Sequence, residues 1–304
     1  MELTRGIIIR SQSGFYTVKT DEGIEVTAHI RGRFKQGPKT GDILAVGDWV
    51  KLSPQDDGKY MIEEIEPRTS KLARLAPTAR GEYEQIIIAN PDQVVFVFSC
   101  ADPAPKMRML DRFLIIAEQQ DIPPLIVANK VDLIGMRKAK KLFGHYPKIG
   151  YPVFYTSAMR KEGIRNLRKH LNNKISVFAG PSGVGKSSLL NVIQPRLGLE
   201  VSEISQATRK GRHTTTVRGM FPLVKGGYVA DTPGLKSLGL WDIEPEELDG
   251  YFPEIAPLVA SCEYNNCTHF EEPGCAVIAA VESGEIHPDR YESFVRLRYG
   301  EDNR

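Results

Sequence analysis

Near the middle of this 304-residue chain lies the sequence Gly180-Pro181-Ser182-Gly183-Val184-Gly185-Lys186-Ser187-Ser188. A glycine, four further residues and then Gly-Lys-Ser is the spacing of a phosphate-binding loop, which is preceded by a buried strand and followed by a helix. The apolar run 175–179 and residues 188–193 predict that strand and that helix. In such a loop the backbone N–H groups surround a phosphate, Lys186 reaches the terminal phosphates, and the Ser187 hydroxyl binds Mg²⁺. The sequence therefore predicts binding of a nucleoside triphosphate. A glycine-rich turn with no ligand is the alternative.

Strands and helices are expected to alternate on both sides of this loop. The expected strands are 94–99, 124–128, 153–156, 175–179, 219–224 and 228–230, with helices near 110–117, 138–143 and 164–171. Such alternation predicts an α/β domain with a mostly parallel sheet wrapped by helices. Ligands then bind at the carboxyl ends of the strands.

Two of these expected strands end in polar sequences, Asn129-Lys130-Val131-Asp132 and Thr156-Ser157-Ala158. The Asp132 carboxylate can accept hydrogen bonds from N1–H and the N2 amino group of guanine, and adenine offers no matching donors. Asn129 can bind another polar edge of the base, and the Lys130 stem can cover the ring. The two sequences predict GTP and GDP as ligands. The alternative is a P-loop kinase, which a comparison of GTP with ATP binding would identify.

Two later segments are expected to complete the phosphate site. Residues 207–216 are polar, and Thr215 is predicted to join Ser187 on Mg²⁺ when a γ-phosphate is present. The strand 228–230 leads into Asp231-Thr232-Pro233-Gly234, in which Asp231 is the expected carboxylate on the metal side and Gly234 the expected N–H donor to the γ-phosphate.

The order of these motifs is unusual, because the guanine-binding sequences precede the phosphate loop. Ordinary small GTPases have the reverse order. Leu235 also stands where many GTPases have the glutamine that orients the attacking water, so slow intrinsic hydrolysis is expected. His213 is predicted to act in its place as the catalytic group beside Lys186. Its alternative role is a contact with a partner or with solvent.

Three of the four cysteines lie close together near the C-terminus. Cys262, Cys267, His269 and Cys275 form a Cys-x4-Cys-x-His-x5-Cys pattern. Three sulfurs and one imidazole suit a closed, structural Zn²⁺ site. Helices are expected near 276–282 and 288–299. Cys100 lies at the end of an apolar run and is predicted to be a buried thiol.

The first 66 residues predict five short strands, at 6–10, 15–20, 24–30, 48–52 and 60–65, with a hairpin turn at 21–23. Five such strands favour a small barrel of the oligonucleotide-binding (OB) type. The basic segment 31–35 contains Phe34 and could contact a stacked base. The alternative is a barrel that serves only for docking. Residues 67–84 are polar and basic, contain Pro77, and are interpreted as a linker.

The net charge of +2 conceals a strong asymmetry along the chain. Residues 68–239 hold 27 Lys and Arg against 12 Asp and Glu, whereas residues 240–304 hold 4 against 15. The basic section predicts a polyanionic partner such as nucleic acid, unless its lysines only solvate helix faces. A signal peptide and an apolar run long enough for a membrane span are absent from the sequence, so a cytoplasmic protein without a membrane partner is expected.

These motifs together resemble one family, the circularly permuted GTPases of the RsgA/YjeQ type that assist late maturation of the bacterial small ribosomal subunit. The resemblance covers essentially the whole chain. It implies an OB-fold barrel over 1–67, a circularly permuted P-loop GTPase domain over 68–239 and a zinc-binding, mainly helical domain over 240–304.

The same resemblance implies an activity, cofactors and partners. GTP hydrolysis would be stimulated by the small (30S) subunit, with GTP/GDP, Mg²⁺ and one structural Zn²⁺ as cofactors. The barrel and the zinc domain would contact the ribosome and its rRNA, alongside other assembly factors, and the protein would be a monomer. The competing hypothesis is an RNA-binding assembly module in which GTP is only structural.

Overall fold

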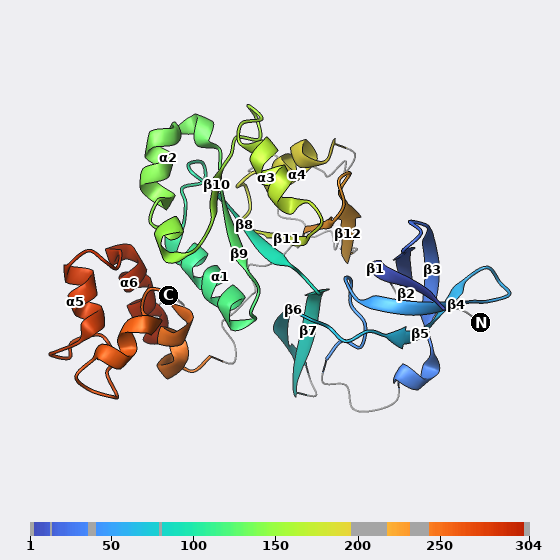
Figure 1. Ribbon diagram of the computed structural model, residues 1–304, viewed down its shortest axis with the longest axis horizontal. Helices are drawn as coiled ribbons and strands as arrows, with labels where there is room; N and C mark the ends of the chain where they lie inside the picture. The colour runs from blue at the N-terminus through green and yellow to red at the C-terminus, as the bar shows by residue number, and fades with distance from the viewer. Residues whose placement is uncertain are drawn as a thin grey trace.

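The computed structural model describes residues 3–12, 14–35, 41–78, 81–195, 218–231 and 243–300. Figure 1 shows three parts side by side: an N-terminal barrel, a central sheet with helices, and a C-terminal helical region. In the part of the chain that the structure describes, no helix combines the length and the apolar character that crossing a membrane requires.

The N-terminal barrel contains β1 (Thr4–Gln12), β2 (Phe15–Thr20), β3 (Glu25–Ile30), β4 (Trp49–Pro54) and β5 (Tyr60–Ile65). The strand order is β1-β2-β3-β5-β4, and β4 pairs back onto β1, which closes the barrel. Strands β3 and β5 are parallel and the other pairs are antiparallel. Alternating side chains such as Val18, Ala28 and Ile62 fill the interior. The five predicted strands and the turn at 21–23 are confirmed, and a short 3₁₀ helix, η1 (Gly32–Lys35), follows β3.

The segment interpreted as a linker is instead a β-hairpin, so that prediction was wrong. Strands β6 (Lys71–Thr78) and β7 (Gly81–Ala89) pair antiparallel as a separate two-stranded sheet. Every strand of a two-stranded sheet has a free edge, which allows Pro77 to lie within β6 without breaking a ladder on both sides. The hairpin is fixed to the barrel by Asp42, whose carboxylate accepts hydrogen bonds from the Tyr83 hydroxyl at 2.8 Å and the Ile86 N–H at 2.9 Å.

The central sheet has the order β10-β9-β8-β11-β13-β12. Its elements, in chain order, are β8 (Gln93–Ser99), α1 (Met107–Gln119), β9 (Pro124–Asn129), η2 (Val131–Leu133), α2 (Met136–Phe143), η3 (Tyr146–Ile149), β10 (Val153–Tyr155), α3 (Ile164–Leu171), β11 (Ile175–Ala179), α4 (Lys186–Ile193), β12 (Arg218–Pro222) and β13 (Tyr228–Asp231). Strands β8, β9, β10, β11 and β13 are parallel, and β12 is antiparallel to β13. The phosphate-loop strand β11 lies between β8 and β13, so motifs on both sides of it in the sequence meet at one sheet edge.

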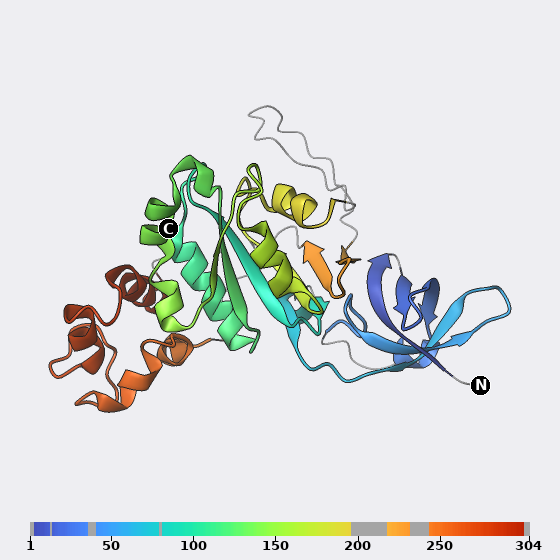
Figure 2. The same cartoon turned by 45° about the horizontal axis from the view of Figure 1, so that its top comes forward.

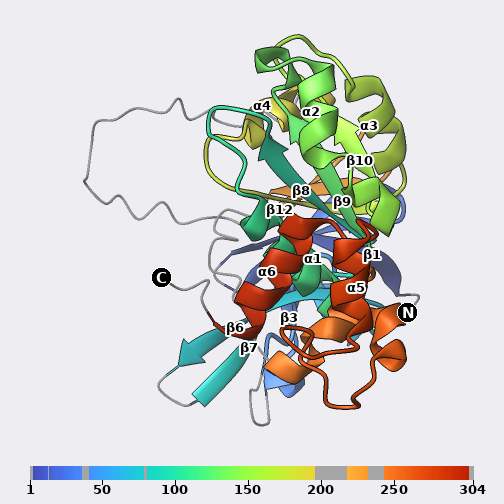
Figure 3. The same ribbon diagram turned by 90° about the vertical axis from the view of Figure 1, so that its left-hand side faces the viewer.

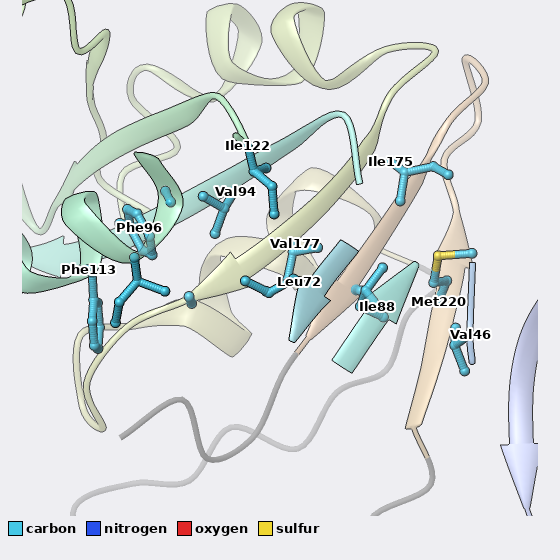
Figure 4. Close-up of a cluster of buried hydrophobic side chains, with 14 of the residues drawn as sticks. Val46, Leu72, Ile88, Val94, Phe96, Phe113, Ile122, Ile175, Val177 and Met220 are labelled. Atoms are coloured by element: carbon cyan, nitrogen blue, oxygen red, sulfur yellow. The ribbon is translucent and has the colours of Figure 1, made fainter. Parts of the chain in front are cut away.

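Strand β8 is buried along its whole length because helices and strands cover both faces of the sheet. Val94, Phe96 and Phe98 point into a core that also contains residues of the barrel, the hairpin and α1. Figure 4 shows part of this core, with Val46, Leu72, Ile88, Phe113 and Met220 among its members. Val95 and Val97 point to the opposite face, beneath α3 and α4.

The barrel and the central sheet are continuous through one short ladder. Arg10 and Ser11 of β1 pair with Gly219 and Arg218 of β12, which joins the strands into a single 11-stranded sheet. Figure 2 shows β12 and β13 at the side of the central sheet that faces the barrel.

The C-terminal region contains η6 (Pro245–Tyr251), η7 (Ala256–Ser261), α5 (Ala276–Glu282) and α6 (Pro288–Arg298). Helix α6 lies against α1 of the central domain (Figure 3). At this contact Arg290, only 1% exposed, donates to Asp111 of α1 at 2.8 Å and to both carboxylate oxygens of Glu254 at 2.6 and 3.2 Å. The Asp111 carboxylate also accepts from the Tyr146 and Ser293 hydroxyls at 2.8 and 2.5 Å. The helical region is therefore fixed to α1 by a buried, fully hydrogen-bonded ion network.

Candidate functional site

The phosphate-binding loop follows β11 and leads into α4, as the sequence predicts. Gly180 packs so closely on β8 that a Cβ there would lie 2.2 Å from the Val97 carbonyl oxygen. Gly185 has a φ of 86°, and its Cβ would lie 2.6 Å from Nδ2 of Asn129. Side chains are therefore excluded at both positions, which leaves the backbone free to approach a phosphate. Lys186, Ser187 and Ser188 form the first turn of α4, where the helix dipole favours an anion.

Asn129 connects the three motifs that the sequence placed apart. Its Nδ2 donates to the Val184 carbonyl oxygen of the phosphate loop at 2.9 Å. Its Oδ1 accepts from the Thr156 hydroxyl at 3.0 Å and from the Ala158 N–H at 3.3 Å. The residue is 1% exposed, so these bonds form away from water. Among the described residues, two donors bind the Asn129 oxygen and one acceptor binds its NH₂ group, so one N–H is available to a base.

Lys130 of the guanine motif contacts the loop that follows β8. Lys130 adopts a left-handed conformation, with φ 61°, and its ammonium group donates to the Asp102 carbonyl oxygen. The Lys130 Cε atom lies 3.7 Å from the point that a Cβ on Gly185 would occupy. Val131 is buried and donates its N–H to the Thr156 carbonyl oxygen at 3.1 Å. Asp132 is only partly exposed. The Lys130 side chain therefore extends from the guanine motif past Gly185 of the phosphate loop to Asp102. An extended stem of this kind can cover one face of a guanine ring.

Cys100 lies beside this motif and is 3% exposed, as expected for a buried thiol. Its N–H donates to the Asn129 carbonyl oxygen at 2.8 Å. Burial, with a further contribution from the Asp132 charge, raises the pKa of the Cys100 thiol to about 12. The thiol therefore stays protonated at neutral pH and adds no charge next to the guanine motif.

The Thr156-Ser157-Ala158 segment packs beside Asn129, with its two hydroxyl side chains pointing into the protein. The Thr156 and Ser157 side chains are fully buried. The Ser157 hydroxyl accepts from the Arg160 N–H at 3.0 Å, and its backbone exchanges two hydrogen bonds of 3.1 Å with Glu162. Because both side chains point inward, only backbone atoms of this segment and Ala158 can reach a base.

Some predicted residues lie outside the described part of the chain. These are His213, Thr215 and Gly234, and the Asp231 side chain is likewise not described. The Asp231 backbone ends β13 and pairs with Phe178, two residues before Gly180. Strand order thus brings this position next to the phosphate loop.

The four predicted metal ligands come together in the C-terminal region. Their ligand atoms all lie within 4.8 Å of one another. Nδ1 of His269 is 3.5 Å from the sulfurs of both Cys262 and Cys275, and those two sulfurs are 3.9 Å apart. Tetrahedral Zn²⁺ with ordinary bond lengths separates two sulfurs by about 3.8 Å and a sulfur from a nitrogen by about 3.6 Å. The residues present therefore fit a zinc ion.

Two contacts that sequence reasoning missed hold His269 in place, one at its ring and one at its backbone. Its Nε2 lies 3.4 Å from Oδ2 of Asp249, which leaves Nδ1 facing the sulfurs. The Tyr291 hydroxyl of α6 donates to the His269 carbonyl oxygen at 2.7 Å. A carboxylate on the second nitrogen is the usual way to fix a metal-ligating histidine. An acidic residue 20 positions away has no spacing rule that could have revealed it.

The basic segment expected to contact nucleic acid is partly neutralised. The Arg31 guanidinium donates to the Glu63 carboxylate at 2.7 Å, and Glu63 also accepts from Ser53 at 2.9 Å. Arg31 is therefore half of a barrel ion pair, which weakens the argument that this loop is a cationic contact.

Family models match this chain over both of its first two parts. The family described as RsgA GTPase matches residues 65–241, and the RsgA N-terminal domain matches residues 5–62. The chain belongs to the RsgA GTPase family. Membership implies a guanine nucleotide and Mg²⁺ at the site described above, and a GTP hydrolase activity.

Relatives cover almost the full length of this family member. A protein of Gemmatimonas aurantiaca, named small ribosomal subunit biogenesis GTPase RsgA, is 45% identical over 97% of this chain and 96% of its own. The protein of that name from Moorella thermoacetica is 42% identical over 95% and 94%.

Two solved structures share the fold. YjeQ from Thermotoga maritima has a TM-score of 0.81 at 37% identity, covering 100% of both chains. YloQ, described as a circularly permuted GTPase, has a TM-score of 0.76 at 35% identity, covering 100% of this chain and 96% of its own. The predicted barrel and permuted GTPase domain are therefore confirmed.

Proposed function

We propose that the protein binds GTP, hydrolyses it to GDP and phosphate, and binds the small ribosomal subunit during the subunit's late maturation. The observation that carries the first part is Asn129, which joins the phosphate loop, the guanine motif and the Thr156–Ala158 segment in one buried hydrogen-bond cluster. A P-loop kinase has no need for such a cluster. The ribosomal part is supported by the names of relatives that match nearly the whole chain.

The polar residues that face the nucleotide have proposed roles in this reaction. Asp132 accepts from the guanine N1–H and N2 amino group, and Lys130 covers the ring. Lys186 and the loop backbone bind the β- and γ-phosphates. Ser187, Thr215 and Asp231 are the proposed ligands or supports of Mg²⁺, which neutralises charge that develops on the phosphates. Gly234 donates its N–H to the γ-phosphate.

His213 is the proposed group that positions the attacking water. Leu235 has no polar atom in its side chain, and an imidazole can accept a proton near neutral pH. On this proposal the chain alone hydrolyses GTP slowly, and the subunit accelerates the reaction by placing His213.

The C-terminal cluster is proposed to hold one structural Zn²⁺, with Cys262, Cys267, His269 and Cys275 as ligands. Four protein ligands leave no open position, which is the property of a structural site. We further propose that the protein is a cytoplasmic monomer and that it contacts rRNA when it binds the small subunit. Its proposed domains are 1–67, 68–239 and 240–304.

The test measures two quantities, co-pelleting with separated ribosomal subunits and single-turnover hydrolysis of GTP with and without them. Wild type should pellet with small subunits when a non-hydrolysable GTP analogue is bound and should hydrolyse GTP faster when they are present. Lys186→Ala should lose turnover. His213→Ala should keep GTP affinity and subunit binding but lose about 10²–10⁴-fold of the stimulated rate.

The outcomes separate the parts of the proposal. A separate equilibrium titration compares GTP with ATP binding, and equal binding of the two would refute the guanine site. Absence of stimulation by small subunits in wild type would leave a GTP-dependent binding module. Full stimulation of His213→Ala would show that another group positions the water.

A further inference from the structure

Ser99 carries a buried hydroxyl group that has no role in the proposed reaction. It is the last residue of β8, where residues 94–98 before it are all apolar, and it is only 1% exposed. Strand register places it directly opposite Asn129 of the guanine motif. Its hydroxyl donates a hydrogen bond of 2.5 Å to the Pro103 carbonyl oxygen. Because a buried hydroxyl is costly without a partner, this bond closes the turn 99–103 at a defined geometry.

The turn 99–103 contains the carbonyl group that binds Lys130. Asp102 adopts a left-handed conformation, with φ 46°, which aspartate tolerates better than most residues. Its carbonyl oxygen accepts a hydrogen bond from the Lys130 ammonium group. The start of the turn is fixed to β9, because the Cys100 N–H donates to the Asn129 carbonyl oxygen at 2.8 Å. With the serine hydroxyl closing the other end, the carbonyl group is held in place by bonds within the protein.

A lysine that covers a ring needs such a fixed acceptor. The Lys130 stem has four rotatable carbons, and its ammonium group faces water, which competes for its hydrogen bonds. At the backbone end Lys130 is fixed in a left-handed conformation, with φ 61°. At the other end it is fixed by Asp102, and between them Cε passes close to Gly185. A stem held at both ends loses less freedom when a guanine ring packs on it.

We propose that Ser99 is a positioning residue for the guanine nucleotide, and that it slows nucleotide dissociation by holding the Asp102 carbonyl group under the Lys130 ammonium group. The inference rests on the proposed function, because it takes the Lys130 stem to cover the ring. It goes beyond that function by assigning the effect to a residue outside the nucleotide-binding motifs. Ser99 itself does not touch the nucleotide.

The experiment measures the dissociation rate of a GDP analogue labelled at the ribose, in stopped flow with the full-length protein. Lys130→Ala should accelerate dissociation by about tenfold, since a cation and its stem on a ring contribute about that much. Ser99→Ala should accelerate it by about fivefold, because the stem remains but its anchor is lost. In the Lys130→Ala background, Ser99→Ala should change the rate by less than about 1.5-fold. A serine with only a structural role would give the same factor in both backgrounds.

A second nucleotide tests what Ser99 acts on. Inosine diphosphate lacks the N2 amino group of guanine but has the same ring face. Ser99→Ala should therefore accelerate dissociation of the labelled inosine and guanosine diphosphates by the same factor. A variant that disturbed the base edge instead, through Asn129 or Asp132, would change the ratio of the two rates.

Ser176→Ala is the matched control, because it also removes a fully buried hydroxyl from the central sheet. The Ser176 hydroxyl accepts from the Gln93 side chain at 2.9 Å, at the opposite end of β8 from Ser99. The two variants should lose similar amounts of stability in chemical denaturation. Only Ser99→Ala should change the dissociation rate.

Two substitutions of Asp102 test the same anchor without a change in the buried core, and they decide the question if Ser99→Ala does not fold. Asp102→Asn keeps a residue that tolerates positive φ, whereas Asp102→Val introduces a β-branched residue that does not. Both remove the same charge, so their difference reports the backbone alone. Asp102→Asn should dissociate GDP as wild type does, and Asp102→Val should approach Lys130→Ala.

The outcomes distinguish the two levels of the argument. If Lys130→Ala leaves GDP dissociation unchanged, the proposed role of Lys130 fails and this inference fails with it. If Lys130→Ala accelerates dissociation but Ser99→Ala and Asp102→Val do not, only the positioning role is overturned. Equal effects of Ser99→Ala in the two backgrounds, or an equal effect of Ser176→Ala, would likewise overturn it.

Discussion

Nδ2 of Asn129 donates a hydrogen bond of 2.9 Å to the carbonyl oxygen of Val184, 55 residues further along the chain. The same amide accepts from Thr156 and Ala158. One side chain of the guanine motif therefore holds a carbonyl group of the phosphate loop in place. Base recognition and phosphate binding are consequently parts of one buried structure.

Asn129→Ala should weaken GTP, GDP and ATP binding together, because it releases the loop as well as the base. It should also lower the free energy of unfolding by about 1–3 kcal/mol, since the buried Thr156 hydroxyl loses its acceptor. Titration with a fluorescent GDP analogue and chemical denaturation measure the two effects. Arg160→Ala is the control, because its hydrogen bond to Ser157 comes from the backbone and is retained. A variant with normal stability and reduced GTP binding alone would contradict the connecting role.

Asp132→Asn should change the selectivity for GTP over ATP and leave the structure of the phosphate loop unchanged. The new amide presents a donor where guanine requires acceptors, so the preference for GTP over ATP should fall at least tenfold. Competition binding with GTP, ATP and xanthosine triphosphate measures it, and xanthosine triphosphate should gain affinity because its base offers an acceptor at that position. Unchanged ratios would exclude Asp132 from the base contact.

Cys262→Ala or Cys275→Ala should remove about one zinc per chain and destabilise the C-terminal region, because metal binding contributes directly to the folding of such a site. Cys100→Ala should leave the metal content unchanged, since Cys100 is not in the cluster. Elemental analysis of protein purified without chelator, together with thermal unfolding, tests this. A zinc-free wild-type protein would refute the metal site.

Arg290→Met should destabilise the contact between α6 and α1 by about 3–5 kcal/mol, because it leaves the Asp111 and Glu254 carboxylates buried without their partner. Arg296 lies on the same helix and pairs with Glu292 at the surface, at 2.9 Å. Arg296→Met should therefore cost only ~0.5 kcal/mol. Denaturation of both variants, with zinc content measured in parallel, compares the two. Equal losses would show that the buried network contributes no more than a surface pair.

His145 should make stability dependent on pH. Its ring stacks on His287 of the C-terminal region, with centroids 4.2 Å apart. Burial, followed by the nearby His287 charge, lowers the pKa of His145 from 6.5 to about 4. Between those values the unfolded chain binds a proton that the folded chain does not, so stability falls as the pH decreases from about 6.5 towards 4.

His145→Gln should remove this contribution, which is about 1–2 kcal/mol after allowance for the ring's partial exposure. The measurement is the difference in unfolding free energy between variant and wild type at several pH values, which cancels other titrating groups. A difference that stays constant from pH 7 to pH 5 would contradict the assignment.

The amino-acid sequence by itself determined the elements and the chemistry of the motifs. Apolar runs and fixed spacings are local signals, and they located β2, β5, β11, α3 and α5 with the bounds that the structure has. The cluster of four possible metal ligands was recognised for the same reason, since Cys262 and Cys275 are close in sequence as well as in space.

Only the tertiary structure decided how these parts are joined. The linker interpretation of residues 67–84 failed because the β6–β7 hairpin depends on packing against the barrel and α1, which has no signature in a polar, proline-containing segment. Arg290 and Asp111 lie 179 positions apart, and the pairing of Arg10 with Gly219 spans an even longer separation. Contacts over such distances follow from where whole elements pack against one another, so no local pattern of residues specifies them.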